Sequence, residues 1–335
     1  MNKKKLGVLI NPKSYNDATF YYIELVKKCF TIKDYEVIES QNIKDLKFCD
    51  ILFTITLKDY LKTIKYPFKK KIYWFQGIKP EENYMYEPNK IKFFILSLLE
   101  FFVLHTTHLN IFVSINMLNH YVGKYKYRKN NYQIIPCYNQ TLNDESFEFK
   151  DKYKLPSFVY AGSLSKWQCI DEMLASYKLI EEVLHNASLT ILTNDISNAK
   201  KIVDNYKLKK YSIKYVEPND LNKELIKYKY GFILRKKDPV NDVATPTKMN
   251  TYMANGIIPI IANIFQNISV FNNEFIINTK NINPNDILLQ ILKYEKKEII
   301  SSEIKKQYSE IFEAYYNSKT YTMQLLLSID KLYIK

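Results

Sequence analysis

The segment 231–262 combines residues that could hold a phosphorylated ligand. Its sequence, GFILRKKDPVNDVATPTKMNTYMANGIIPIIA, opens with an apolar run that predicts a buried strand ending at Arg235. After a polar loop, Pro246 and Thr247 precede a helical pattern, and proline is favoured in the first turn of a helix. A helix start offers free amide groups and the positive end of the helix dipole, to which Lys248 adds a full charge. Together these groups could hold a diphosphate.

The alternative is that Arg235 and Lys248 are two more cations of a basic chain. The 335 residues include 49 Lys and Arg against 35 Asp and Glu, which gives a net charge of +14. Lysine is spread along the whole sequence, so a solvated basic surface accounts for much of this charge. The remainder favours anionic membrane surfaces or phosphorylated substrates. A nucleic-acid partner is not expected, because the sequence has no recognisable binding module and no dense arginine cluster.

Glycine is scarce, which excludes two classes of phosphate site. The chain has six glycines where average usage predicts roughly 23, and the two nearest to each other, Gly231 and Gly256, are 25 positions apart. Both the dinucleotide loop G-x-G-x-x-G and the phosphate loop G-x-x-x-x-G-K need clustered glycines. A phosphate site in this chain must therefore use isolated turns, helix ends and cationic side chains.

No metal or other cofactor is indicated. The sequence contains no D-x-D pair that would hold Mg²⁺ on a nucleotide. His105 and His108 have a spacing that permits a shared metal, but no third ligand is evident, and a helix surface explains them equally well.

Strand-length apolar runs alternate with amphipathic segments, which is typical of α/β proteins with parallel sheets. The pattern predicts strands at 5–10, 50–56, 71–76, 111–114 and 132–136, and then at 158–162, 188–193, 211–216, 231–234, 257–262 and 274–278. It predicts helices at 17–30, 90–105, 115–122, 169–184, 196–206, 220–228, 247–255 and 303–333. The polar stretch 139–156 is the best candidate linker. Length and pattern thus predict two domains, 1–150 and 151–315, with a ligand site in the cleft between them.

The most hydrophobic stretch is IKFFILSLLEFFVL at 91–104. It is shorter than the roughly 20 residues that span a bilayer, and Glu100 interrupts it. We expect a buried helix here; an interfacial helix beside lysines is the alternative. The N-terminus has no secretory h-region, so a cytoplasmic protein, or one peripheral at the inner face of the membrane, is expected.

The motifs P-T-K, Y-M-A-N-G and I-P-I within 244–260 resemble the donor-sugar motif of retaining GT-B glycosyltransferases, especially family-four-like enzymes of bacterial surface-polysaccharide synthesis. Residues 158–172, 74–86 and 111–121 are also similar to this group. The resemblance implies two Rossmann-like domains, the first on the acceptor side and the second binding a nucleotide sugar, and a C-terminal helix at 316–335 that crosses back to the first domain. The implied acceptor is a glycan or lipid-linked molecule of capsule, O-antigen or lipooligosaccharide synthesis.

Carried over by motif, the resemblance implies a role for particular residues. Arg235 and Lys248 would neutralise the leaving diphosphate, and Thr247 would donate its hydroxyl or amide. The other implied donor-side residues are Gly162 and Ser163 at the diphosphate, Lys166 and Trp167 bordering it, Val216 and Glu217 at the nucleobase, and Asn241, Pro246 and Thr251. On the acceptor and sugar side are Gln76, Gly77, Glu81 and Glu82.

Three positions depart from the group. Thr251 and Val243 stand where many relatives have a pair of carboxylates, and Gln76 stands where relatives often have histidine. If configuration is retained, the leaving phosphate itself can take the acceptor proton; for an inverting reaction the candidate bases are Glu81, Glu82 and Asp17. The alternatives to a glycosyltransferase are a nucleotide-sugar epimerase or hydrolase on the same fold and a non-catalytic basic protein that binds anions or membranes.

Overall fold

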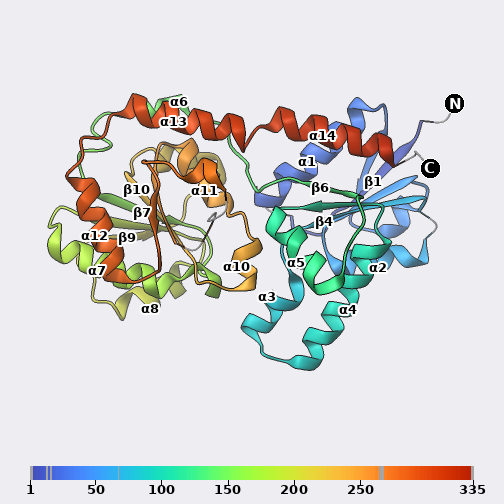
Figure 1. Ribbon diagram of the computed structural model, residues 1–335, viewed down its shortest axis with the longest axis horizontal. Helices are drawn as coiled ribbons and strands as arrows, with labels where there is room; N and C mark the ends of the chain where they lie inside the picture. Colours follow the sequence, from blue (N-terminus) through green and yellow to red (C-terminus); the bar gives the residue numbers. More distant parts are fainter. Residues whose placement is uncertain are drawn as a thin grey trace. The chain divides into compact units, whose positions relative to one another are not determined.

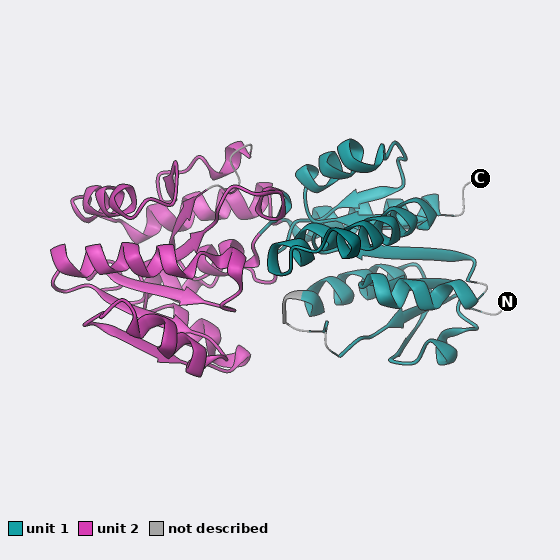
Figure 2. Cartoon of the chain, turned by 90° about the horizontal axis from the view of Figure 1, so that it is seen from below, with its two compact units in different colours: residues 1–137, 243–245, 317–335 teal, residues 138–242, 246–316 magenta. Residues whose placement is uncertain are grey.

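The computed structural model of the chain describes residues 3–12, 14–15, 17–66, 68–262, 264 and 268–332, without the side chains of residues 17 and 18. Two compact units emerge from it (Figure 2). Unit 1 comprises residues 1–137, 243–245 and 317–335, and unit 2 comprises residues 138–242 and 246–316. Each unit is built on one six-stranded sheet in which all paired strands are parallel.

The sheet of unit 1 has the strand order β2-β1-β3-β4-β5-β6 (Figure 1). Its strands are β1 (Lys5–Leu9), β2 (Glu36–Ser40), β3 (Ile51–Thr54), β4 (Lys70–Phe75), β5 (Leu109–Phe112) and β6 (Tyr132–Ile134). Its helices are α1 (Asp17–Ile32), α2 (Leu57–Lys62), α3 (Lys79–Tyr86), α4 (Lys90–Thr106), α5 (Ile115–Tyr125) and α14 (Ser318–Lys331). The pattern of apolar runs predicted every strand of this sheet except β2.

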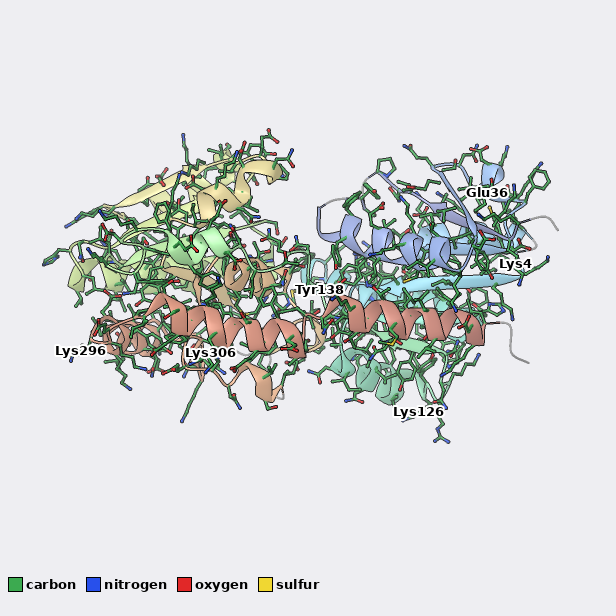
Figure 3. The ribbon with its side chains drawn as sticks, turned by 90° about the horizontal axis from the view of Figure 1, so that it is seen from above. Lys4, Glu36, Lys126, Tyr138, Lys296 and Lys306 are labelled. Carbon is green, nitrogen blue, oxygen red and sulfur yellow. The ribbon has the colours of Figure 1, made fainter. Side chains whose placement is uncertain are left out.

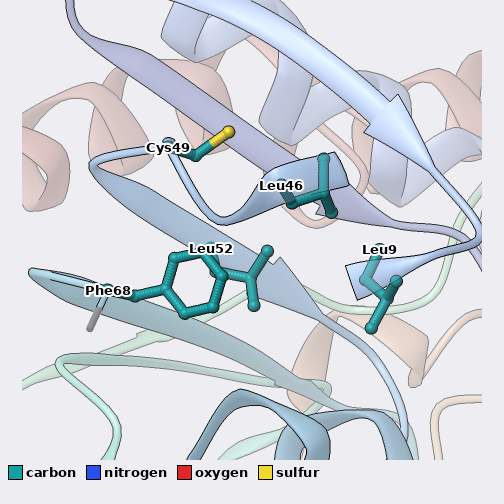
Figure 4. Close-up of a cluster of buried hydrophobic side chains, with 5 residues drawn as sticks. All are labelled: Leu9, Leu46, Cys49, Leu52 and Phe68. Carbon is teal, nitrogen blue, oxygen red and sulfur yellow. The ribbon is translucent and has the colours of Figure 1, made fainter. Parts of the chain in front are cut away.

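A small apolar cluster fills the region beside β1 and β3 (Figure 4). Leu9 and Leu52 come from these strands, and Leu46 comes from the short 3-10 helix η1 (Ile43–Leu46). Cys49 and Phe68 complete the cluster, and all five side chains are buried. The apolar contacts hold the connection between β2 and β3 against the sheet.

Helix α4 corrects the expectation for the stretch 91–104. The helix forms as predicted, but only Glu100, Val103 and Leu104 are buried along its length. Its apolar residues at 91, 94, 95, 98, 101 and 102 are exposed, so the prediction of a buried helix is wrong for this face. No helix in the described part of the chain is both long and apolar enough to cross a bilayer.

Glu100 is the polar residue that anchors the inner face of α4, and it is 1% exposed. Its carboxylate accepts hydrogen bonds from the Lys79 amide (3.1 Å) and from the hydroxyls of Tyr121 (3.2 Å) and Tyr125 (2.8 Å). Burial raises the pKa of Glu100 to about 7, although the nearby Lys124 charge and the Tyr125 hydroxyl offset part of the effect.

The raised pKa predicts that Glu100 lowers stability as the pH rises. Between about pH 5 and pH 8 the unfolded chain releases this proton first, so the folded state loses stability until its own carboxyl ionises. Glu100→Gln cannot ionise, and its advantage over wild type should be about 2–3 kcal/mol larger at pH 8 than at pH 5. Urea unfolding at the two pH values measures this, with the exposed Glu310→Gln as control. An equal advantage at both values would contradict the prediction.

The sheet of unit 2 has the order β12-β11-β10-β7-β8-β9. Its strands are β7 (Ser157–Ala161), β8 (Ser188–Leu192), β9 (Tyr211–Lys214), β10 (Tyr230–Leu234), β11 (Ile258–Ala262) and β12 (Ile277–Thr279), all near their predicted positions. Its helices are α6 (Asp144–Glu148), α7 (Ile170–Val183), α8 (Ile196–Asp204), α9 (Leu221–Leu225), α10 (Pro239–Val243), α11 (Thr247–Ala254), α12 (Pro284–Glu295) and α13 (Ser301–Ala314). The first strand in sequence, β7, lies beside the fourth, β10, which is the strand order of dinucleotide-binding sheets.

The predicted linker 139–156 is packed within unit 2. The amides of Asn139 and Gln140 both donate to Oδ1 of Asn250, at 3.0 and 2.9 Å. The buried Lys152 ammonium donates to the carbonyl of Asn255. The polar groups of this segment therefore serve as hydrogen-bond partners of α11 and of Asn255, which follows the helix.

The predicted closing helix 303–333 is two helices, α13 and α14, separated by Tyr315–Asn317. Asn317 caps α14 by accepting from the Thr320 amide (3.1 Å). Helix α14 lies beside α1, where Ser318 accepts from the Tyr21 hydroxyl (3.0 Å) and Asp330 pairs with Lys33 (2.6 Å). Helix α14 is thus part of unit 1, whereas α13 is part of unit 2.

Gly231 lets α11 approach β10. A Cβ atom at this position would lie 2.4 Å from Cδ2 of Tyr252, well inside van der Waals contact. The Tyr252 ring therefore packs directly on the strand, and its hydroxyl accepts a hydrogen bond from the Ala161 amide at the end of β7 (2.9 Å). Tyr252 thereby fixes α11 against both central strands of the sheet.

Gly231→Ala should destabilise unit 2 by about 1–3 kcal/mol, because the buried Tyr252 ring has to move. The matched control is Gly123→Ala, since a Cβ atom at Gly123 meets nothing within 4 Å and the residue lies inside α5. That change should stabilise the chain by about 0.4–1 kcal/mol. Chemical denaturation of both variants tests the pair; similar effects at the two positions would contradict the packing argument.

Candidate functional site

The order of strands in unit 2 predicts where a ligand site would lie. Strands β8 and β9 lie on one side of the β7–β10 pair, and β11 and β12 lie on the other. In open α/β sheets, ligands bind beyond the carboxyl ends of the strands at such a switch point. Gly162 directly follows β7 and Arg235 directly follows β10, so both lie at this point.

Gly162 has a backbone geometry that other residues rarely adopt. Its φ is +140°, and its amide donates to the carbonyl of Leu192 (2.9 Å). A Cβ atom there would lie 3.2 Å from Nζ of Lys248. Glycine is thus favoured by the backbone of the turn after β7, and a Cβ atom there would make the end of Lys248 shift by a few tenths of an ångström.

Arg235 and Lys248 converge on one amide oxygen. Oε1 of Gln168 accepts from Nη1 of Arg235 (2.7 Å) and from Nζ of Lys248 (2.6 Å). Arg235 is 4% exposed and Gln168 is 9% exposed, whereas Lys248 is half-buried. Gln168 lies in the 3-10 helix η3 (Lys166–Gln168), and Cys169 then turns the chain into α7 with a φ of +53°.

Arg235 and Lys248 share the neutral oxygen of Gln168, and Arg235 also donates to the Leu234 carbonyl (3.1 Å). Burial lowers the pKa of Arg235, and burial together with the charge of Arg235 lowers the pKa of Lys248 well below its usual value. Nζ of Lys248 also lies 3.9 Å from the centre of the Tyr160 ring. An anion bound here would favour the charged forms of both side chains.

Helix α11 presents its N-terminus next to Lys248. Pro246 is the N-cap residue, and among the described residues no side chain caps this end. Thr247 and Lys248 are the first two helical residues, while the Met249 amide donates to the Pro246 carbonyl (3.0 Å). Thr251 is buried and its hydroxyl bonds to the Thr247 carbonyl (3.2 Å) and to Asn139 (3.3 Å). Thr251 therefore supports the first turn of the helix.

The loop after Gly162 carries the other predicted diphosphate residues. Ser163 is exposed, and its hydroxyl lies 2.9 Å from that of Ser165. The Ser163 carbonyl accepts from the Tyr160 hydroxyl, which fixes the loop to β7. Lys166 is exposed and Trp167 is half-buried, both in η3 just before Gln168.

Val216 and Glu217 follow β9, two strands away from β7 on the same edge of the sheet. Glu217 is exposed, accepts from the Tyr215 hydroxyl (3.2 Å), and is the N-cap of a short 3-10 helix. Strands in a sheet lie about 4.8 Å apart, so this position is about 10 Å along the edge from β7.

Asn241 lies in the short helix α10 and donates both amide hydrogens to the segment just before it. Its Nδ2 donates to the Lys236 carbonyl (2.9 Å) and to the Asp238 carboxylate (2.6 Å). Asn241 is 2% exposed, and its hydrogen bonds hold together the segment between Arg235 and α11.

The predicted acceptor-side residues lie in unit 1, after β4. Gln76 is exposed and donates to the Ile55 carbonyl (3.4 Å), and Gly77 lies next to the side chain of Glu82. Glu82 pairs with Lys79 (3.1 Å). The side chain of Asp17, the third candidate base, lies outside the described part of the structure.

Glu81 of α3 forms an ion pair with Lys124 of α5. Its Oε1 lies 2.7 Å from Nζ of Lys124 and 3.3 Å from Nε2 of His120. Burial alone would raise the pKa of Glu81, but the hydrogen bonds from His120 and Lys124 outweigh it and lower the pKa. A carboxylate stabilised in this way is a weak base.

His105 lies in the last turn of α4, whereas His108 lies after the helix, just before β5, and the two make separate backbone contacts. Nδ1 of His105 lies 2.9 Å from the Phe101 carbonyl, and Nδ1 of His108 accepts from the Lys71 amide (3.2 Å). The described residues contain no group of three or more potential metal ligands among His, Cys, Asp and Glu.

Sequence reasoning missed the residues that hold the two cations in place. Gln168 was not singled out because a lone glutamine in a loop carries no motif. Tyr160 and Tyr252 were part of recognised segments, but nothing in their spacing indicated that one would lie under Lys248 and the other would fix α11 to β7.

Solved structures with this fold are found at low sequence identity. Sucrose-phosphate synthase from Thermosynechococcus elongatus matches with a TM-score of 0.76 and 9% identity, covering 99% of both chains. HepE from Anabaena, solved with UDP, matches with a TM-score of 0.70 and 9% identity, covering 98% of this chain and 100% of that one. TarM from S. aureus matches with a TM-score of 0.65 and 14% identity, covering 85% of this chain and 55% of that one.

Our chain thus spans about half the length of TarM. A scan against protein-family models finds no match, and neither does a search of curated proteins. Two parallel six-stranded sheets with their helices, matched across nearly the whole chain by these structures, give this protein the GT-B fold.

Proposed function

We propose that the chain is a glycosyltransferase that takes a sugar from a nucleotide-diphosphate donor. The observation that carries this proposal is the convergence of Arg235 and Lys248 on Gln168 at the switch point of unit 2. Two buried or half-buried cations next to a helix N-terminus provide the charge that a diphosphate needs.

The nucleotide we propose is UDP. Solved structures of HepE with UDP-glucose and of TarM with UDP share the fold of this chain. The edge beyond β9, with Val216 and Glu217, is our proposed position for the nucleobase, because it lies on the same end of the sheet as Gly162. Ser163, Lys166 and Trp167 would then border the diphosphate.

In the proposed reaction, the bond between the anomeric carbon and the diphosphate oxygen breaks, and the acceptor hydroxyl oxygen bonds to the anomeric carbon. The electron pair of the broken bond goes to the diphosphate, where Arg235 and Lys248 stabilise the developing negative charge. We propose that configuration is retained, that the leaving phosphate takes the acceptor proton, and that no metal is needed. The pairing of Glu81 with Lys124 makes it a poor alternative base.

The acceptor we propose is a glycan or lipid-linked molecule of surface-polysaccharide synthesis. Gln76 and Gly77 lie just beyond the carboxyl end of β4, which is the end of a parallel sheet where ligands bind. We assign them to the acceptor side on this basis.

A thermal-shift panel of UDP, GDP, ADP, dTDP and CMP tests the donor assignment. UDP should raise the melting temperature most, because a ligand that binds only the folded state stabilises it. No shift with any nucleotide would count against a nucleotide-sugar enzyme. Incubation with UDP-sugars alone is the second arm: free sugar or an epimer formed without acceptor would identify a hydrolase or epimerase instead of a transferase.

A further inference from the structure

Helix α4 carries a continuous apolar stripe on its exposed face. The stripe consists of Ile91, Phe94, Ile95, Leu98, Phe101 and Phe102. The first four are 75%, 62%, 52% and 53% exposed. Their spacing of three and four residues places all six on one side of the helix.

The exposed face of α4 is apolar, whereas an ordinary surface helix exposes its polar face. The buried residues of α4 include the carboxylate of Glu100, held by two tyrosine hydroxyls, while the phenylalanines and leucine point outward. Helices α3 and α4 contact each other as a hairpin that projects from the sheet of unit 1 (Figure 1). An exposed apolar patch of this extent marks a surface that another molecule covers.

Cations lie at both ends of the stripe. Lys90 and Lys92 occupy the first turn of α4, where positive charge opposes the helix dipole and so does not serve helix stability. Lys92 pairs with Glu87 (2.7 Å). At the other end, Nζ of Lys129 donates to the His105 carbonyl (2.6 Å).

Lys129 belongs to a basic segment that follows α5. Lys126, Arg128 and Lys129 are exposed, and no acidic residue lies between Glu100 and Asp144 in the sequence. The side chain of Lys126 extends away from the ribbon (Figure 3). The only acidic residue of α4 itself is the buried Glu100.

We propose that the α4 stripe docks unit 1 onto the surface of an anionic lipid bilayer. The helix would lie in the plane of the interface, with the stripe among the upper acyl chains and with Lys90, Lys126, Arg128 and Lys129 at the phosphate headgroups. This surface is formed by unit 1 alone, so the inference does not depend on the sugar-transfer activity.

Charge favours a membrane over a second copy of the chain. In a two-fold dimer the stripe of one copy meets that of the other, which brings the flanking lysines of both copies toward each other. Repulsion between these cations opposes such a dimer, whereas anionic headgroups neutralise them at a cytoplasmic-type membrane surface. The same reasoning excludes a basic protein partner.

Vesicle co-sedimentation of the full chain tests the proposal. With phosphatidylcholine vesicles containing 30% phosphatidylglycerol, we expect binding that weakens as salt is raised and that is at least about tenfold weaker on pure phosphatidylcholine. The triple variant Phe94→Ser, Ile95→Ser, Leu98→Ser should lose at least about tenfold in partitioning. Lys90→Glu combined with Lys126→Glu should lose binding to the anionic vesicles. The control is Met323→Ser with Leu327→Ser, two residues of α14 that are 61% and 57% exposed, which should bind as wild type.

Equal binding by the wild type and the triple variant, or no preference for anionic vesicles, would overturn the proposal. So would a dimer in solution that the triple variant converts to a monomer, because the stripe would then be covered by a second copy. The nucleotide-induced thermal shift of the triple variant should equal that of the wild type. Loss of vesicle binding with an intact shift separates this surface from the donor site in unit 2.

Discussion

Lys248→Ala is expected to lower the rate of sugar transfer by a factor of about 10²–10³ while the chain stays folded. Removing one preorganised group that stabilises transition-state charge typically has an effect of this size. The loss should fall mainly on kcat, because the negative charge on the diphosphate grows as the sugar leaves. The measurement is the rate of UDP release from the donor that the wild type uses, in the presence of acceptor.

The folded state of this variant should be at least as stable as the wild type without ligand. The pKa of Lys248 is lowered by burial and by the charge of Arg235, which means that the ammonium is unfavourable where it lies until an anion binds. The matched control is Lys237→Ala, since Lys237 is exposed in the loop after β10. Near-normal turnover of Lys248→Ala, or an equal loss in the control, would remove Lys248 from the proposed site.

Gln168→Glu is expected to weaken UDP binding by about 10- to 100-fold and to raise the melting temperature of the unliganded chain. The new carboxylate would lie between Arg235 and Lys248, within hydrogen-bond distance of both. Charge-assisted bonds of this kind are worth about 1.5–3 kcal/mol. The carboxylate thus stabilises the unliganded site and neutralises the positive charge that the diphosphate would otherwise contact.

Gln168→Ala separates this charge effect from simple loss of contact. It removes the shared acceptor without adding a charge, so it should bind UDP better than Gln168→Glu does and should melt below the wild type. Titration calorimetry and thermal melts of both variants provide the comparison. If Gln168→Glu binds UDP as tightly as the wild type, the oxygen of Gln168 does not mark the position of the phosphate.

The alternation of apolar and amphipathic segments predicted eleven of the twelve strands that the structure describes. Strand β10 is an unbroken apolar run, so its end at Arg235 could be located within a residue. Strand β2 was missed because its sequence EVIES contains two glutamates and lies at the sheet edge, where the period-2 pattern is weak. Helix α3 was missed because its eight residues carry few apolar groups.

The orientation of α4 could not be predicted for a different reason. Residues 91–104 are apolar almost all the way round, so hydropathy alone does not reveal which side faces the sheet. The position of Glu100 suggested an interruption, whereas the fold buries this carboxylate among tyrosine hydroxyls supplied by α5. Such partners are distant in sequence, and only the three-dimensional arrangement brings them together.

Part of the candidate site could be predicted from the sequence, because some of its residues adjoin the ends of predicted strands or helices. Arg235 and Lys248 were singled out because each adjoins a strand or helix end that the sequence marks, and Gly162 was singled out by the resemblance of its segment. Gln168 was not found, because its role depends on a contact with both cations that no local pattern encodes. Asn241 was placed among the donor-binding residues by the resemblance, and in the structure its Nδ2 donates to Lys236 and Asp238 in the segment before α10.

The central claim is that Arg235 and Lys248 hold the diphosphate of the donor, and calorimetric titration with UDP and with UMP tests it most directly. The two ligands share the nucleoside and differ in the second phosphate, so the ratio of their affinities reports on that phosphate alone. The account predicts that the wild type binds UDP at least about tenfold more tightly than UMP, which is about 1.4 kcal/mol, and that Lys248→Ala abolishes this preference. Equal affinity of the wild type for UDP and UMP, or an unchanged preference in Lys248→Ala, would contradict it.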